Sequence, residues 1–450
     1  MSISASARLD VQAELDRLTG AEGIERVPGV AIGVLEDGVV EVWTSGVASP
    51  AHSSSVTPET LFRIASISKL YTATLVMQLV DEGKVDLDRP LREQLPGFRL
   101  ADQAATAAVT VRHLLCHTSG IPGDFGFDGG RGDDAVARYV AALADLPPVF
   151  APGLLHSYSN AGFVVLGRLV EYVTGATWDE AIQERIARPL GLENTVTLPE
   201  DVLLRRHAVG HATDAKAGTV TPIKRWTANR ASGPCGIISS SVVDLLAFGR
   251  WHLESPRPAM FEPQVTLPQP SHADAWGLGF ELQWSGDRLV ASHGGNVAGQ
   301  TSTLLLIPDR KAAVAVLTSS DFGRLRTREV MQRLLAERFD VRLPGEAPKA
   351  PAGTPDIDFD RYVGAYERVD QRLDIARADD GGLQITLTAT RAYPPGGQLD
   401  EPLTLPLRAV REDVFLLRSP GAPVDAPVVF TEQADGRTYL RVGLRSTPRS

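Results

Sequence analysis

The sequence predicts an α+β protein in which an antiparallel sheet flanked by helices carries an inserted helical subdomain, followed by a separate all-β unit. Two β-rich regions, at about residues 30–44 and 279–318, lie on either side of a helical, loop-rich stretch at about 80–250. Beyond residue 357 the chain contains short β-runs separated by Gly, Pro or Asp, with no helical period. These runs predict a small antiparallel barrel or sandwich.

The chain is predicted to begin with a helix and a β-hairpin. An amphipathic helix is expected at about residues 6–20, and β-rich runs follow at 30–35 and 39–44. Asp37-Gly38 separates the two runs. This dipeptide is a strong signal for the type I′ turn that joins paired strands.

The next predicted element is a helix that begins near Ser66 and stops at Gly83. One face of it carries the apolar residues Leu70, Leu75, Val76, Leu79 and Val80. Further helices are expected within the insertion at 134–145, 161–175 and 241–253.

Strands are predicted to return after the insertion. β-runs occupy 279–284, 289–292, 301–307 and 312–318, with Pro308-Asp309-Arg310 as a turn, and an Arg-rich helix is expected at about 323–338. The order of helix, two strands, helical insertion, strands and helix predicts an antiparallel sheet covered by helices.

The chain is expected to divide at a linker into domains 1–343 and 357–450. Residues 344–356 have the Pro- and Gly-containing composition of a linker. The β-runs of the second unit lie at 362–369, 372–376, 383–389, 403–410, 414–418, 428–432 and 438–444.

Composition argues against several classes of partner. The chain of 450 residues is 43% apolar and 22% charged, which is typical of a globular protein. Its net charge of −10, with no basic cluster to offset it, argues against a nucleic-acid partner. No 18-residue apolar window suggests a membrane span. Residues 1–10 show no secretory signal, so a cytoplasmic location is expected.

Cysteine and histidine usage predicts neither disulfides nor a metal. Cys116 and Cys235 are too few for a disulfide framework. His113 and His117 have the four-residue spacing of zinc ligands, but no Glu follows His113. No cofactor and no metal site are therefore expected.

Ser66 and Lys69 are predicted to form a catalytic pair. Residues three apart on a helix lie one above the other, so Lys69 is expected to stand next to Ser66. A serine hydroxyl needs an adjacent base to become a nucleophile, and a desolvated neutral lysine is able to supply it. We therefore expect Lys69 to take the hydroxyl proton as Ser66 attacks a carbonyl carbon.

Two later motifs strengthen this interpretation. Tyr158 and Asn160 lie on a loop just before a predicted helix, where the phenol can relay a proton to a leaving group. The Asn160 amide can hold the acyl side chain or Lys69. The second motif is His293-Gly294-Gly295-Asn296, at the end of a predicted strand, where two glycines let a ligand approach the backbone closely. The amide N–H groups of Asn296 and Ser66 can form an oxyanion hole.

In this order, the Ser-x-x-Lys tetrad, the Tyr-x-Asn loop and the His-Gly-Gly strand closely resemble the class C β-lactamase-like family. That family includes penicillin-binding-protein-like esterases, D-amino-acid peptidases and acyltransferases. The resemblance covers about residues 20–340 and extends to the loops 114–120 and 236–245. It implies a β-lactamase/transpeptidase-like sheet and serine acyl-transfer chemistry.

The resemblance also implies roles for individual residues. Ser66 corresponds to the acylated nucleophile, Lys69 and Tyr158 share the acid–base work, and Asn160 is a polar contact. His293 stands where many members carry the lysine of Lys-Thr-Gly. Losing that fixed cation weakens the case for recognition of a β-lactam carboxylate, and members with His there are often esterases or peptidases.

Within the family, the chain resembles the penicillin-binding-protein-type thioesterases, whose C-terminal unit is lipocalin-like. These take a peptidyl thioester from the phosphopantetheine arm of a carrier protein in nonribosomal peptide synthesis and release it as a macrolactam. The resemblance implies head-to-tail cyclisation. Two alternatives stay open: an intracellular esterase or D-stereospecific aminopeptidase that uses water, and a non-catalytic binding protein that retains the fold.

Each candidate also has a purely structural interpretation. Ser66 and Asn160 are possible helix caps, Tyr158 a packed phenol and His293 a structural histidine. Alternation places Arg441 and Arg445 on one face of the last predicted strand. There they are expected either to hold an acidic group of the carrier or substrate, or to form a solvated face of the barrel.

Overall fold

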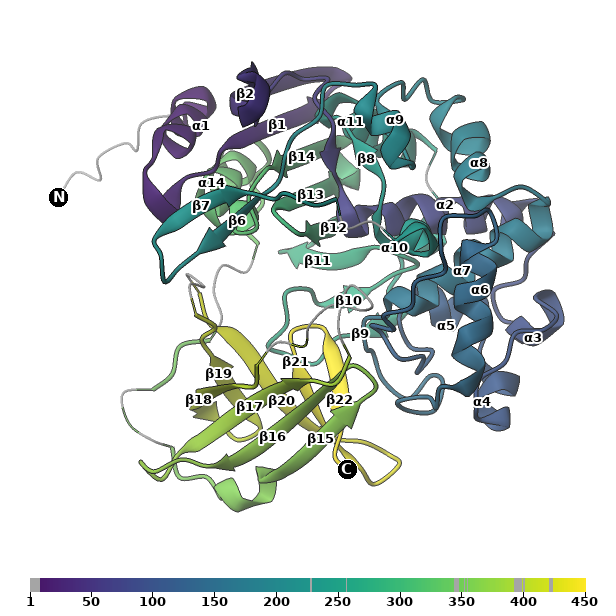
Figure 1. Ribbon diagram of the computed structural model, residues 1–450, viewed down its shortest axis with the longest axis vertical. Helices are drawn as coiled ribbons and strands as arrows, with labels where there is room; N and C mark the ends of the chain where they lie inside the picture. Colours follow the sequence, from purple (N-terminus) through teal and green to yellow (C-terminus); the bar gives the residue numbers. More distant parts are fainter. Residues whose placement is uncertain are drawn as a thin grey trace.

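The computed structural model contains a helix-and-sheet unit joined to a small β-barrel (Figure 1). It describes residues 9–226, 229–255, 257–343, 348–351, 353, 355–391, 399, 401–420 and 424–450. Among these residues the first unit is built on a nine-stranded sheet in the order β3-β2-β1-β14-β13-β12-β11-β10-β9. The predicted α+β class is confirmed.

The predicted strands of the central sheet are present, and neighbouring strands run antiparallel. Asp37 and Gly38 have φ angles of 50° and 78°, as a type I′ turn requires. Val30 pairs with Thr318, so β1, which precedes the insertion, lies beside β14, which follows it. The strands are β1 (Gly29–Glu36), β2 (Val39–Ser49), β3 (Ser54–Ser55), β9 (Val265–Thr266), β10 (Ala275–Trp276), β11 (Glu281–Ser285), β12 (Arg288–Val297), β13 (Gln300–Ile307) and β14 (Ala312–Thr318).

Both faces of the central sheet are buried, which explains the uninterrupted apolar runs in β1 and β14. Ala31 and Leu35 face the large core that contains α2 (Ser68–Asp81) and α11 (Val242–Glu254). Val30 and Ile32 face the second core, which contains α1 (Val11–Gly20) and α14 (Arg328–Phe339). The sheet is therefore a rigid layer between two sets of helices.

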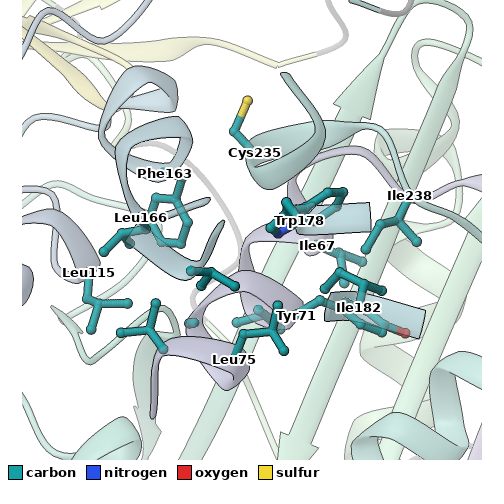
Figure 2. Close-up of a cluster of buried hydrophobic side chains, with 14 of the residues drawn as sticks. Ile67, Tyr71, Leu75, Leu115, Phe163, Leu166, Trp178, Ile182, Cys235 and Ile238 are labelled. Carbon is teal, nitrogen blue, oxygen red and sulfur yellow. The ribbon is translucent and has the colours of Figure 1, made fainter. Parts of the chain in front are cut away.

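The inserted region packs around α2, whose buried neighbours Figure 2 shows in close-up. The predicted helices at 134–145, 161–175 and 241–253 are confirmed as α6 with a following turn, α7 and α11. No helix among the described residues is long and apolar enough to cross a membrane. The other helices of this region are α3 (Leu91–Gln94), α4 (Gln103–Ala108), α5 (Val111–Leu115), α6 (Ala135–Ala142), α7 (Asn160–Thr174), α8 (Trp178–Ile182), α9 (Pro199–Leu203), α10 (Gly233–Gly236) and α12 (Pro258–Phe261).

Helix ends differ from the predictions for local reasons. α1 begins at Val11 because the side chain of Asp10 accepts the N–H of Ala13; the predicted residues 6–8 lie outside the described residues. The helix predicted at 323–338 is divided at Thr327 into α13 (Gly323–Arg326) and α14.

Short strands that periodicity did not predict occur in the insertion and just before it. β6 (His211–Asp214) and β7 (Thr219–Pro222) form a hairpin. A second small sheet joins β4 (Phe62–Arg63), β8 (Ser239–Ser240) and β5 (Thr195–Val196). Two to four residues are too few to show a two-residue period, so only tertiary pairing defines these strands.

The C-terminal unit is an antiparallel sheet whose eight described strands follow one another in sequence order. All seven predicted β-runs contain a strand, and an eighth strand, β22, follows a turn at Gly443. A bridge between Tyr366 and Arg449 brings β15 next to β22, so the sheet nearly closes into a barrel. The strands are β15 (Gly364–Arg368), β16 (Gln371–Arg377), β17 (Leu383–Ala389), β18 (Leu403–Arg411), β19 (Val414–Leu417), β20 (Ala426–Glu432), β21 (Thr438–Val442) and β22 (Arg445–Pro448).

The domain boundaries predicted at residues 343 and 357 stay a prediction. The barrel has its own buried core, which includes Tyr366, Phe415 and Phe430. Part of the predicted linker, residues 344–347, 352 and 354, lies outside the described residues.

Candidate active site

Ser66 lies in a tight turn at the N-terminal end of α2. A short 3₁₀ turn, Ala65–Ile67, precedes the helix, and Ala65 has a left-handed φ of 48°. Such a conformation is unfavourable for a residue with a Cβ atom and is often found at functional sites. Within residues 61–70, Ser66 is the one residue that is not fully buried. The turn therefore leaves Ser66 partly accessible on an otherwise buried segment.

Lys69 contacts the Ser66 hydroxyl, as the helical spacing predicted. Its Nζ lies 3.3 Å from Ser66 Oγ and donates to Asn160 Oδ1 and to the carbonyl oxygen of Cys235, both at 2.7 Å. Burial lowers the pKa of Lys69 to about 8. When the amine is neutral, two N–H groups satisfy these acceptors and the lone pair is left to face Ser66.

Tyr158 borders the same pair. Lys69 Nζ lies 4.7 Å from the centre of the Tyr158 ring. Burial raises the pKa of the Tyr158 phenol well above its usual range, although a hydrogen bond with Ser66 lowers it somewhat. The phenol therefore keeps its proton at neutral pH, and it is better suited to donate a proton than to act as the resting base.

Asn160 connects Lys69 to a half-buried ion pair that sequence reasoning missed. Its amide Nδ2 donates to Asp124 Oδ1 at 2.7 Å, and Arg445 Nη2 donates to the same oxygen at 2.8 Å. Burial alone would raise the pKa of Asp124, but the charge of Arg445 lowers it, so the carboxylate is ionised. No local sequence pattern marks Asp124, because its importance depends on contacts with Asn160 and with the distant barrel.

The predicted arrangement of Arg441 and Arg445 is wrong. Gly443 turns the chain between them, so Arg441 belongs to β21 and Arg445 to β22. Arg445 pairs with Val442, the neighbour of Arg441, which places the two arginines on opposite faces. Arg441 Nη2 donates to the carbonyl oxygens of Pro268 and Pro270, both at 2.7 Å. Arg445 instead donates to the carboxylate of Asp124 in its own chain, and not to a group of a carrier or substrate.

The β21–β22 hairpin of the barrel is bonded directly to the loop that carries Tyr158. The amide of Tyr158 donates to the carbonyl oxygen of Leu444 at 2.9 Å. The amide of Ser446 donates to Ser157 Oγ at 3.0 Å. The barrel thus forms part of the wall behind the candidate active site.

His117 holds the same loop from the other side. Its carbonyl oxygen accepts the N–H of Ser157 at 2.9 Å, and its Nδ1 accepts the N–H of Ser159 at 3.0 Å. Its ring centre is 4.3 Å from that of Tyr158. Burial lowers the pKa of His117 well below its usual range, so the ring stays neutral and Nδ1 remains an acceptor. The described residues contain no cluster of three or more potential metal ligands.

Replacing His117 tests this second support. His117 is buried and has a left-handed φ of 59°. In His117→Phe the buried N–H of Ser159 loses its acceptor, so we expect the free energy of unfolding to fall by about 1–3 kcal/mol. His117→Asn, which tolerates a left-handed φ and offers an amide oxygen, is expected to recover part of that loss. Urea denaturation measures both, and equal destabilisation would argue against the hydrogen bond.

The His293 motif lies within a longer strand than predicted, because β12 continues to Val297. His293 is buried, its Nδ1 donates to the carbonyl oxygen of Gly294 at 2.7 Å, and burial lowers its pKa to about 4. It is therefore neutral and does not replace the family's fixed cation. The centre of its ring lies 6.2 Å from the centre of the Tyr158 ring.

Gly294, Gly295 and Asn296 border the nucleophile through their backbone. A Cβ atom at Gly295 would collide with the carbonyl oxygen of Ile64, two residues before Ser66. This close approach brings β12 against the turn that carries the nucleophile. Asn296 pairs with Thr301 in β13 and has an exposed side chain. The predicted oxyanion hole from the N–H groups of Ser66 and Asn296 stays a prediction.

The fold and the Ser66–Lys69 pair indicate a serine hydrolase of the β-lactamase and penicillin-binding-protein type. The sequence profile named Beta-lactamase matches residues 15–338, and the chain therefore belongs to that family. This confirms the resemblance on which the sequence interpretation was based.

Individual relatives extend the likeness. "Penicillin-binding protein 4" of Amycolatopsis lactamdurans is 38% identical over 360 residues, covering 76% of this chain and 93% of the relative. A "D-aminopeptidase" of Gluconobacter oxydans (strain 621H) is 26% identical, covering 82% of this chain and 69% of the relative. The crystal structure of SurE superposes with a TM-score of 0.79 at 29% identity and covers 98% of both chains. SurE has also been solved with D-Leu. The likeness to SurE thus includes the C-terminal barrel.

Proposed function

We propose that the protein transfers the peptidyl group of a thioester onto Ser66 and releases it by attack of the peptide's own amine, which yields a head-to-tail macrolactam. The observation that carries the acyl-transfer step is the buried Lys69 amine, with its lowered pKa, 3.3 Å from the Ser66 hydroxyl. The proposal includes a cytoplasmic location and a carrier protein whose phosphopantetheine arm presents the thioester.

The reaction proceeds in two balanced halves. Ser66 Oγ attacks the thioester carbonyl carbon while its proton passes to Lys69 Nζ, and the N–H groups of Ser66 and Asn296 hold the resulting oxyanion. When the C–S bond breaks, the thiolate takes a proton from Tyr158, which recovers one from Lys69. The peptide amine then attacks the carbonyl carbon of the acyl-enzyme, and its proton passes to Lys69. As the ester C–O bond breaks, Lys69 gives a proton to Ser66 Oγ, which restores the hydroxyl and leaves Lys69 neutral.

Aminolysis requires that water be kept from the ester, and the buried setting of the site supports this. Lys69 is fully buried, and the barrel hairpin closes one wall by its bonds to the Tyr158 loop. The neutral His293 supplies no fixed cation for a β-lactam carboxylate. A structure of SurE with D-Leu and a relative named D-aminopeptidase support a substrate with a D-residue near the reacting carbonyl.

Product analysis tests the proposal. A synthetic peptide that ends in a D-residue, activated as an N-acetylcysteamine thioester, is incubated with the protein, and the products are separated by mass. A cyclic product lighter than the linear acid by one water is expected. Linear acid alone would favour the hydrolase alternative, which the D-aminopeptidase relative supports. No reaction and no acylated protein would favour the non-catalytic alternative.

The pH profile tests the base. We expect kcat/KM for an uncharged ester to rise with pH and to level off above about 8, because burial lowers the pKa of Lys69 to about 8 and only the neutral amine accepts a proton. Well below this value the rate should fall about tenfold per pH unit. Initial rates between about pH 6 and 10 measure the profile, and a flat profile would contradict the assignment.

Two variants should move this profile in opposite directions. The charge of Arg445 lowers the pKa of Lys69, whereas that of Asp124 raises it. Arg445→Gln is therefore expected to shift the midpoint to higher pH, and Asp124→Asn to lower pH. Shifts of the same sign in the two variants would show that the Asp124–Arg445 pair acts through the shape of the loop and not through its charges.

A further inference from the structure

A basic surface with exposed apolar side chains borders the candidate active site. Residues 203–226 contain five Lys or Arg residues and one acidic residue, although the whole chain carries a net charge of −10. The five bases are spread along 24 residues and form no run, so no basic cluster is apparent in the sequence. We define the basic rim by its six exposed side chains: Leu203, Leu204, Arg206, Lys224, Arg225 and Trp226.

Both ends of the basic rim are attached to the segment that leads to Ser66. The amide of Leu61 donates to the carbonyl oxygen of Arg206 at 2.9 Å. At the other end, the guanidinium of Arg63 lies 4.8 Å from the centre of the Trp226 ring. Leu61 and Arg63 precede Ser66 by five and three residues, so the rim lies beside the strand that enters the nucleophile turn.

The middle of this segment is attached to the other side of the site. The amide of His211 donates to the carbonyl oxygen of Gly299 at 3.0 Å. Within the segment, the amide of Ile223 donates to the carbonyl oxygen of Gly210 at 2.8 Å. Gly299 lies in the turn that connects β12 to β13, directly after the strand that carries Asn296. The segment 203–226 therefore runs between the two elements that are expected to form the oxyanion hole.

The side chains of the basic rim are available to a partner. Within the described ranges, none of Arg206, Lys224 and Arg225 forms an ion pair with an acidic side chain. Leu203 and Leu204 are 71% and 82% exposed, and Trp226 is 40% exposed. Apolar side chains gathered among unpaired charges are typical of a protein-binding surface, where they make the buried contacts and the charges steer the approach.

We propose that the basic rim docks an acidic face of the carrier protein that delivers the thioester. This inference rests on the proposed function. The tethered acyl group has to reach Ser66, so the carrier must bind beside the nucleophile, and the rim meets that requirement. A positive surface attracts an acidic partner, and complementary charges speed the encounter of the two proteins. The exposed leucines and Trp226 add apolar contacts that a free small anion does not need.

Two forms of one substrate separate docking from chemistry. The peptide is supplied either on a holo carrier-protein domain or as its N-acetylcysteamine thioester, which has no carrier. In the variant Arg206→Glu, Lys224→Glu, Arg225→Glu, kcat/KM for the carrier-bound peptide is expected to fall by about 10- to 1000-fold and to lose its salt dependence. The rate with the N-acetylcysteamine thioester is expected to stay within about twofold, because no catalytic group has changed.

A matched control carries the same change of charge elsewhere. Arg89, Arg92 and Arg99 are exposed residues around α3, which Figure 1 shows far from the β6–β7 hairpin. The variant Arg89→Glu, Arg92→Glu, Arg99→Glu is expected to turn over both substrates like the wild type. If both triple variants lose carrier turnover equally, the effect is one of net charge and the inference is overturned.

The remaining outcomes are also decisive. Unchanged kcat/KM for the carrier-bound peptide in the rim variant overturns docking, while turnover of the small thioester leaves the proposed function standing. Failure of the wild type with both substrates overturns the proposed function and the docking surface together. Leu204→Asp provides an independent check, since it adds a charge to the apolar part of the rim and is expected to weaken carrier turnover alone by about tenfold.

Discussion

Replacing Ser66 with alanine is expected to lower kcat for a peptidyl thioester by roughly four to six orders of magnitude. The Ser66 hydroxyl is the partly exposed nucleophile candidate beside Lys69, and no covalent intermediate is possible without it. Oxyanion stabilisation and substrate positioning remain, so a small residual rate is expected to persist. Single-turnover mass spectrometry measures the loss as the disappearance of the acylated protein.

A neighbouring serine gives the control for this experiment. The hydroxyl of Ser68 is buried and accepts the N–H of Ile238 at 3.1 Å, so Ser68→Ala removes a structural hydrogen bond and no nucleophile. We expect this variant to be less stable by about 1–3 kcal/mol but still to be acylated on Ser66. Treatment with a fluorophosphonate followed by peptide mapping locates the label, and a label on any other residue would disprove the assignment of Ser66.

Replacing Lys69 with methionine is expected to reduce kcat/KM by about 10²- to 10⁴-fold, the usual effect of removing a general base. Methionine fills a similar space in the buried site, so the loss should come from the missing amine and not from a cavity. The rise of kcat/KM with pH should disappear in this variant, because burial lowers the pKa of Lys69 to about 8 and its loss of a proton is what produces that rise. Comparison of the two pH profiles on folded protein provides the measurement.

Lys69→Arg distinguishes a base from a fixed charge. A guanidinium keeps the positive charge but does not lose its proton at any pH that a protein survives. If Lys69 takes the proton of Ser66, the arginine variant should be as inactive as the methionine variant. Substantial activity in Lys69→Arg would mean that Lys69 acts through its charge, and Tyr158 would then have to be the base.

The central sheet could be predicted because its strands are local patterns. The runs at 30–35 and 312–318 are uninterrupted and apolar because both faces of the sheet are buried there. Asp37-Gly38 predicts the turn between β1 and β2 because these two residues readily adopt the positive φ angles of a type I′ turn. The short strands β4, β5 and β8 could not be predicted in this way. Their two residues each are ordered only by pairing with segments more than 40 residues away in the chain.

The eighth strand of the barrel shows the same limit. The run at 438–444 was predicted as one final strand, but Gly443 adopts a left-handed φ of 61° and reverses the chain. Alternation counted through this turn placed Arg441 and Arg445 on one face, whereas pairing across the hairpin places them on opposite faces. A two-residue period has meaning only within one continuous strand.

The sequence by itself determined that Lys69 lies beside Ser66, because helical turns hold residues three apart next to each other. It also determined that Tyr158 and Asn160 lie together at the N-terminal end of α7, since they are two residues apart in the chain. Only the tertiary structure decided what tunes that pair. His117 and Asp124 lie in the stretch between α5 and α6, and Arg445 lies in the barrel; their hydrogen bonds and charges act on Lys69 and Tyr158 through space. Such contacts leave no periodicity in sequence, because nothing local requires them.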